Sequence, residues 1–177
     1  MLMRVSSGGD PNKIAGAIAG RFRNSEDCIL SAIAADAVNN AVKAVAISSF
    51  HLERTMWFRV NLASVEISGR IKPAAQLRAF AVDPERLSFV SAENVQECRV
   101  TNTPETRPIT DLILACYQEN HLAIDLACVG AGVVYRAVKA IARASKRLKI
   151  RVIPRFEDFE DGVATKTRMI LRICYIR

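Results

Sequence analysis

An internal repeat is the feature that most constrains how this chain of 177 residues folds. Arg4–Ser7 aligns with Arg99–Asn102, and Ala41–Ala46 aligns with Ala137–Ala142 after a single inserted residue. Apolar residues between these segments also match, Ile14, Ile18 and Phe22 against Ile109, Ile113 and Tyr117. A collinear match of this length indicates a tandem duplication, so we predict two copies of one structural unit.

A polar stretch separates the two copies. Asp83–Glu97 contains four acids and one arginine, which is typical of a linker or a long connection. The sequence therefore predicts a first domain at 1–84, a linker at 85–97 and a second domain at 98–177.

The periodicity of apolar residues changes in the same order within each copy. In the first copy it predicts strands at Leu2–Val5, Cys28–Ala34, Trp57–Leu62 and Gln76–Val82, and helices at Ile14–Phe22 and Ala37–Ser49. In the second it predicts strands at Cys98–Val100, Ala123–Val129, Leu148–Ile153 and Arg168–Ile176, and helices at Ile109–Tyr117 and Val133–Ser145. Asp10 before Pro11 is a helix-start signal. The order β-α-β-α-β-β predicts an α+β fold, a two-layer sandwich with both helices on one face of the sheet.

Short motifs in both copies carry a family resemblance. They are Val5–Ser7, Pro11–Ala19 and Asn39–Ile47 in the first copy, and Gly130–Gly132, Ala137–Ala142, Ile153-Pro154, Phe156 and Asp158 in the second. These motifs resemble the stage V sporulation protein S family, whose fold is similar to the Alba chromatin and RNA-binding domain. The resemblance implies two Alba-like domains in tandem and nucleic-acid binding. Bacterial members are single short domains, so a tandem pair departs from the family pattern.

The positive charge lies mainly in the second copy. The net charge of the chain is +7, and the segment from Arg136 to Arg155 holds eight basic residues and no acid. Five of them fall on one side of the predicted helix, and we call them the basic strip: Arg136, Lys139, Arg143, Lys146 and Arg147. A solvated helix face usually mixes both signs. We therefore expect the basic strip, together with Lys149, to contact nucleic-acid phosphates, RNA or DNA, or else an acidic protein surface; an ordinary solvated face is the alternative.

A glycine turn precedes the same helix. Gly130 and Gly132 flank Ala131 where the first copy has Ala34, Ala35 and Asp36. Backbone N–H groups at a helix N-terminus attract anions, so Gly130 and Gly132 are candidate phosphate contacts, or simply meet the needs of a turn and close packing. We expect Asp36 to cap its own helix and to repel phosphate.

The first copy differs at the positions of the basic strip. Asn40, Lys43, Ile47 and Phe50 stand where the second copy has Arg136, Lys139, Arg143 and Lys146. A half-apolar outer face predicts a partner, either the other copy in an internal pseudo-dimer or a second chain. The competing hypothesis is therefore a structural protein that uses the duplicated domain as a scaffold in a larger complex or filament.

Signals for catalysis are weak. The five cysteines form no C-x-x-C pair, and neither His51 nor His121 adjoins a nucleophile motif. Glu157, Asp158, Glu160 and Asp161 are expected in a turn, where they solvate a hairpin or neutralise the basic strip. We therefore expect no catalytic residue, no metal, no cofactor and no enzyme activity. No apolar run is long enough for a membrane span or signal peptide, so we expect a cytoplasmic location, or a nuclear or nucleoid one.

Overall fold

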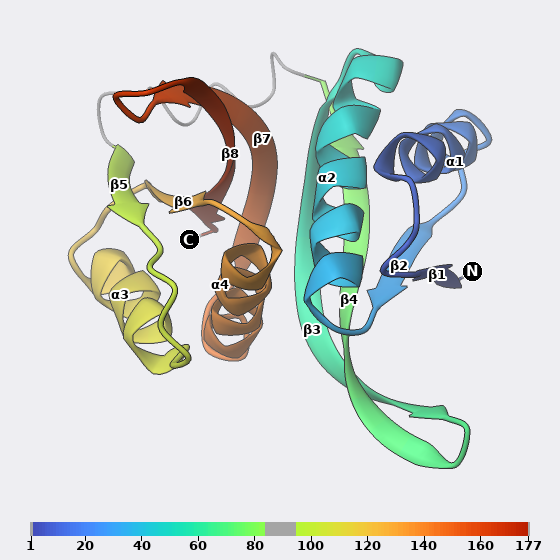
Figure 1. The fold of residues 1–177 in the computed structure, drawn as a ribbon, viewed down its shortest axis with the longest axis horizontal. Helices are drawn as coiled ribbons and strands as arrows, with labels where there is room; N and C mark the ends of the chain where they lie inside the picture. The colour runs from blue at the N-terminus through green and yellow to red at the C-terminus, as the bar shows by residue number, and fades with distance from the viewer. Residues whose placement is uncertain (1, 84–94, 177) are drawn as a thin grey trace.

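The computed structural model describes residues 2–83 and 95–176, and it confirms the predicted α+β class and the order of elements in each repeat (Figure 1). The first repeat consists of β1 (Leu2–Val5), α1 (Pro11–Arg23), β2 (Cys28–Ala32), α2 (Ala35–Leu52), β3 (Thr55–Ile67) and β4 (Arg70–Val82). The second consists of β5 (Val95–Arg99), α3 (Arg107–Gln118), β6 (Ala123–Cys128), α4 (Ala131–Ala144), β7 (Ile150–Glu160) and β8 (Thr165–Tyr175).

The strands of both repeats form one sheet in the order β1-β2-β4-β3-β7-β8-β6-β5. The β1–β2 and β5–β6 pairs are parallel, and the other neighbours are antiparallel. Read outward from the centre, the two halves follow the same sequence of elements. The repeats are therefore halves of one symmetric sheet, which meet at β3 and β7.

The junction joins residues at matching positions of the two repeats. Phe58 of β3 pairs with Val152 of β7. Leu77 and Leu171 occupy corresponding positions in β4 and β8, since each pairs with a leucine of the next strand outward, β2 or β6. The separation of those two leucines in the sequence equals that of Phe58 and Val152. Phe58 and Val152 therefore also occupy corresponding positions in the two repeats. A residue that meets its own counterpart marks a pseudo-two-fold axis, as at the interface of a symmetric dimer.

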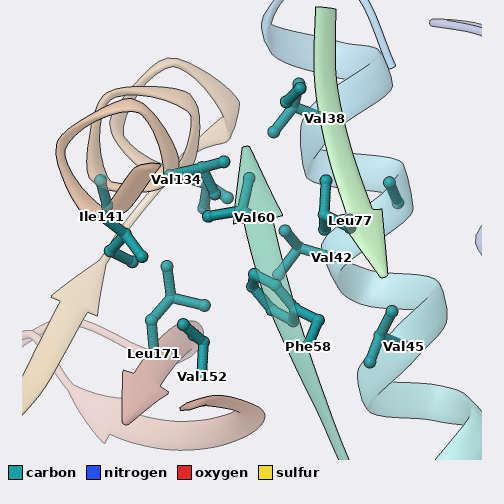
Figure 2. Close-up of a cluster of buried hydrophobic side chains, with 14 of the residues drawn as sticks. Val38, Val42, Val45, Phe58, Val60, Leu77, Val134, Ile141, Val152 and Leu171 are labelled. Atoms are coloured by element: carbon teal, nitrogen blue, oxygen red, sulfur yellow. The ribbon is translucent and has the colours of Figure 1, made fainter. Parts of the chain in front are cut away.

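The hydrophobic core runs without a break across this axis (Figure 2). Helices α2 and α4 pack against each other, and each also contacts the central strand of the other repeat, α2 with β7 and α4 with β3. Their inward residues meet Phe58, which is fully buried. The side chains at the centre are aliphatic apart from Phe58: Val38, Val42, Val45, Val60, Leu77, Val134, Ile141, Val152 and Leu171.

Alternation along β3 separates two faces of the sheet. Met56, Phe58 and Val60 point toward the helices and are buried in the core. Trp57 and Arg59 therefore point to the opposite side, which we call the helix-free face.

The start of α1 agrees with the prediction from the sequence, whereas two other predicted boundaries differ from the structure. Asp10 caps α1, because its side chain accepts a hydrogen bond of 2.9 Å from the Asn12 amide. The β3–β4 hairpin extends well beyond the predicted strands, to a turn at Ser68-Gly69, and projects from the body of the protein (Figure 1). Of the predicted linker, 85–94 lies outside the described residues, whereas 95–97 belongs to β5.

In the part of the chain that the structure describes, no helix has the length and apolar character needed to cross a membrane.

Truncating the side chain at the junction tests this arrangement. We expect Phe58→Ala to lower the free energy of unfolding by about 3–5 kcal/mol, because it opens a cavity between the repeats. Urea unfolding followed by circular dichroism measures this loss. Phe50→Ala, at a side chain whose residue is 74% exposed, is the matched control and should change stability by no more than about 0.5 kcal/mol. Equal effects of the two substitutions would contradict a shared core.

Candidate nucleic-acid interface

The basic strip occupies the outward side of α4. Its opposite side carries the buried residues of the helix, among them Val134, Val138 and Ile141. Within the strip, Arg136 and Lys139 are half-buried, while the other three side chains, Arg143, Lys146 and Arg147, belong to exposed residues. Because Lys146 and Arg147 follow the end of the helix, the strip continues onto the turn before β7.

Neutral groups hold the inner members of the strip in place. Arg136 Nη1 donates a hydrogen bond to Asn102 Oδ1, and Arg143 Nη1 donates one to Thr106 Oγ1, both in the β5–α3 connection. The Lys139 ammonium lies 5.1 Å from the centroid of the Tyr135 ring. These contacts orient the cations without neutralising them.

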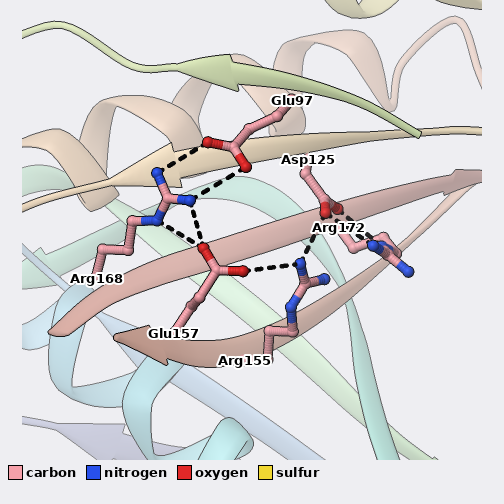
Figure 3. Close-up of polar contacts among 6 residues, drawn as sticks. All are labelled: Glu97, Asp125, Arg155, Glu157, Arg168 and Arg172. Carbon is pink, nitrogen blue, oxygen red and sulfur yellow. Dashed lines mark hydrogen bonds and ion pairs between the residues drawn. The ribbon is translucent and has the colours of Figure 1, made fainter. Parts of the chain in front are cut away.

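Among the described residues, none of the five strip cations forms an ion pair with a carboxylate. The arginines of β7 and β8 provide the contrast (Figure 3). There a chain of contacts on the helix-free face joins three arginines to three acids, Glu97, Arg168, Glu157, Arg155, Asp125 and Arg172. Five cations of the second repeat without a carboxylate partner among the described residues thus lie together in the basic strip.

The Asp125 carboxylate anchors that chain of ion pairs. It accepts hydrogen bonds of 2.8 Å from Arg172 Nε and 2.9 Å from Arg155 Nη2, and its side chain is only 6% exposed. Burial acts to raise the pKa of Asp125, but the hydrogen bonds and charges of Arg172 and Arg155 outweigh it and hold the pKa below its ordinary value of 3.8. Asp125 is therefore ionised at neutral pH.

The predicted position of the late acids is wrong for three of the four. Glu157, Asp158 and Glu160 lie in β7, and only Asp161 lies beyond the strand. Glu157 pairs with Arg155 and Arg168, and Asp161 pairs with Lys166, so these acids do not neutralise the basic strip. Their charges resemble a turn, and Phe156 and Phe159, three residues apart, do not give the period of two that marks a strand.

The turn before α4 has the glycine conformation that its sequence suggested. Gly130 has φ of +89°, and Ala34, its counterpart before α2, has φ of +69°. Gly132 lies in the first turn of α4. Neither helix has a side-chain cap, and within the described residues Asp36 makes no hydrogen bond to the first turn of α2, so the predicted capping by Asp36 is wrong.

The four positions expected to form a partner face do not share one environment. Asn40 is half-buried and donates hydrogen bonds to the Ser7 and Gly9 carbonyls, at 3.0 and 2.9 Å. Lys43 lines a cavity of about 220 Å³ between the repeats, together with Gly130. Ile47 packs against the core, and only Phe50 is strongly exposed.

Lys149 lies apart from the basic strip. It lines a groove of about 350 Å³ with Arg59 and Arg78 of the first repeat. The sequence grouped Lys149 with the strip because it follows Arg147 closely, but α4 has ended by then and the chain has turned toward β7.

The cysteines are all free, and Cys128 and Cys174 are poorly suited to react. Burial raises the pKa of Cys128 to about 12 and that of Cys174 to about 11. Both thiols are therefore protonated at neutral pH, and a protonated thiol is a weak nucleophile and metal ligand. The described residues also contain no group of three or more histidine, cysteine or acidic side chains placed to hold a metal ion.

Comparison with known families identifies the repeat. The family model for stage V sporulation protein S (SpoVS) matches residues 1–77 and 97–176. The chain belongs to the stage V sporulation protein S family. The two matched stretches correspond to the two structural repeats, which confirms a tandem duplication of a SpoVS-like domain. No curated protein sequence matches the chain.

The turns at Gly130 and Ala34 give a prediction about this SpoVS pair. No atom lies within 4 Å of where a Cβ of residue 130 would stand, so Gly130→Ala costs only backbone strain, about 1–2 kcal/mol. Ala34→Gly removes the same strain and should stabilise the protein by about 0.5–1 kcal/mol after the entropy of glycine is counted. Thermal or urea unfolding measures both changes. Changes of the same sign would contradict a shared conformation.

The Asp125 cluster predicts an acid-dependent loss of stability. Because the folded pKa of Asp125 lies below the unfolded one, its contribution is complete above the unfolded value and is lost as the pH falls through the folded value. Asp125→Asn should lower stability at neutral pH by about 3 kcal/mol and flatten the decline below about pH 4. Urea unfolding at a series of pH values measures both effects. Asp111→Asn, at an exposed ion pair, is the control, and an unchanged acid limb in Asp125→Asn would contradict the assignment.

Proposed function

We propose that this SpoVS-family protein is a non-enzymatic nucleic-acid-binding protein whose second repeat contacts phosphates through the basic strip. One observation carries the proposal: the strip cations have no carboxylate partner among the described residues, whereas Arg155, Arg168 and Arg172 of the same repeat all do. Cations on one helix face attract a polyanion and contribute to affinity through counterion release.

The geometry favours phosphate contacts over base contacts. Arg136 and Arg143 are tethered by neutral acceptors, so they present oriented donors at the surface. The exposed Lys146 and Arg147 continue the same line of charge. Phosphate contacts position a nucleic acid without reading its sequence, so we expect little sequence preference and accept RNA or DNA as the ligand. Such a ligand implies a cytoplasmic, nuclear or nucleoid location.

A second candidate function is a role in assembly. Phe50 is 74% exposed and borders a cavity of about 390 Å³ between the repeats, which Met56 and Ile153 also line. An aromatic side chain beside a cavity is a common anchor for a protein partner. In this alternative the duplicated domain serves as a scaffold, and the basic strip binds an acidic protein surface.

Charge reversal at the strip tests the first proposal. We expect Lys146→Glu combined with Arg147→Glu to weaken binding of RNA or DNA oligonucleotides by about tenfold to a hundredfold at low salt, since both side chains would repel phosphate. Fluorescence anisotropy measures the affinity. Arg4→Glu combined with Lys13→Glu makes the same change of net charge on exposed residues of the first repeat and is the matched control. Equal losses in both pairs would indicate a net-charge effect and overturn the strip as the site.

The salt dependence of binding gives an independent readout. Contacts between four to six cations and phosphates predict a slope of about −3 to −5 in a plot of log affinity against log salt concentration. Removing two cations should reduce that slope by about 2.

Light scattering after size-exclusion chromatography, with and without nuclease, distinguishes the scaffold function from nucleic-acid binding, because large assemblies that survive nuclease favour the scaffold.

A further inference from the structure

A row of three arginines crosses the helix-free face where the two repeats meet, and we call Arg78, Arg59 and Arg151 the arginine row. Arg78 of β4 is directly opposite Arg59 of β3. The antiparallel register that pairs Phe58 with Val152 places Arg151 of β7 opposite Arg59 on the other side. Like charges directly opposite each other on neighbouring strands are destabilising, so this row needs a compensating interaction.

An aromatic pair supplies part of that compensation. Trp57 and Phe80 stack with ring centroids 4.1 Å apart and an interplanar angle of 13°. Arg59 and Arg151 lie 5.6 and 5.0 Å from the centroid of Trp57, and Arg78 lies 5.7 Å from that of Phe80. Each guanidinium is therefore held over a ring face by cation–π attraction. The rings fix the cations in place and leave their charge unneutralised.

Carboxylates are scarce around the arginine row. Asp27 Oδ2 accepts a hydrogen bond of 2.8 Å from Arg78 Nη2. In the described part of the chain, Arg59 and Arg151 have no ion pair, and the buried Arg151 Nε has no hydrogen-bond partner. A buried donor without an acceptor is costly, and this cost adds to the repulsion within the row.

The second repeat shows what the row lacks. There the strand partner of Arg172 is Asp125, and at the matching position of the first repeat the strand partner of Arg78 is Ile29. Asp125 neutralises two arginines in the second repeat, and the apolar Ile29 cannot do so. Arg78 pairs instead with Asp27, so in the described part of the chain Arg59 and Arg151 are the members of the row without a carboxylate partner.

The row adjoins a groove that exists only because both repeats contribute to it. The groove of about 350 Å³ lies between β3 and the α4–β7 connection, and its polar lining comes from Arg59, Asn61 and Arg78 of the first repeat and Ser145 and Lys149 of the second. This volume is in the range of small-molecule sites and is too small for a duplex.

We propose that the arginine row and Lys149 bind a small ligand with adjacent phosphate groups, such as a nucleoside polyphosphate. Arginine guanidinium groups match phosphate oxygens with paired donors, and Arg59, Arg78 and Lys149 all line the groove. The arginine row lies on the helix-free face, whereas the second wall of the groove comes from Ser145 and Leu148–Ile150 and so adjoins the end of the basic strip.

Calorimetric titration of the full-length protein with inorganic tripolyphosphate and with a nucleoside triphosphate tests the site. Arg59→Gln combined with Arg151→Gln should weaken both by more than about tenfold. Arg59→Gln combined with Lys149→Gln, at two exposed residues, guards against misfolding of the first pair and should have the same direction of effect. Arg4→Gln combined with Lys13→Gln, at two exposed residues of the first repeat outside the groove, is the matched control and should leave both affinities unchanged.

Two results would overturn the proposal. One is an absence of binding to either probe, and the other is equal weakening by the control pair. Tighter binding of the nucleoside triphosphate than of tripolyphosphate would indicate that the nucleoside also contacts the protein. Equal affinities would indicate that the protein recognises the phosphate groups alone. Arg59→Gln should also raise the melting temperature of the ligand-free protein at low salt, because it relieves repulsion within the row. Oligonucleotide binding measured in parallel distinguishes failure of this site from failure of the basic strip.

Discussion

The packing of Phe58 against its counterpart Val152 is the constraint on which the rest of the molecule depends. A buried residue at the centre of a symmetric junction links β3 to β7 and brings α2 against α4. Two units that each have one apolar helix face and one free central strand thereby bury both at once. Everything at the surface takes its position from this joint, including which side of α4 faces outward.

The two repeats share a symmetric backbone and core, but their surface residues differ. At the positions of the basic strip the first repeat holds one cation, Lys43, among uncharged residues, whereas the second holds only cations, as Asn40 and Arg136 illustrate. On the other face, Ile29 and Asp125 occupy matching places and give the two halves opposite charge balance. Because core residues preserve the fold, such exchanges change what each face can bind without changing how the chain folds.

The sequence predicts features that depend on repeats and on neighbouring residues. It does not predict how strands far apart in the chain pair. The duplication, the order of elements and the Asp10 cap follow from spacing and from short-range hydrogen bonding. The single sheet, the chain of ion pairs at Asp125 and the arginine row depend on pairing between strands far apart in the chain, which periodicity does not encode. The charged segment from Glu157 to Glu160 reads as a turn because the partners of its acids lie on β8 and are placed opposite them only by the pairing of β7 with β8. These partners are Arg168 for Glu157, Thr167 for Asp158 and Thr165 for Glu160. Lys149 was grouped with its sequence neighbours although the chain bends away.

The self-complementary joint also bears on how such a chain assembles. Each half presents the surface that the other half needs, so a tether between them sets an effective concentration of about millimolar for closure within one molecule. Below that concentration, monomeric closure outcompetes pairing between molecules. Crowding above it, or a tether too short to allow closure, would instead favour exchange of halves between chains, and a head-to-tail exchange has no natural end.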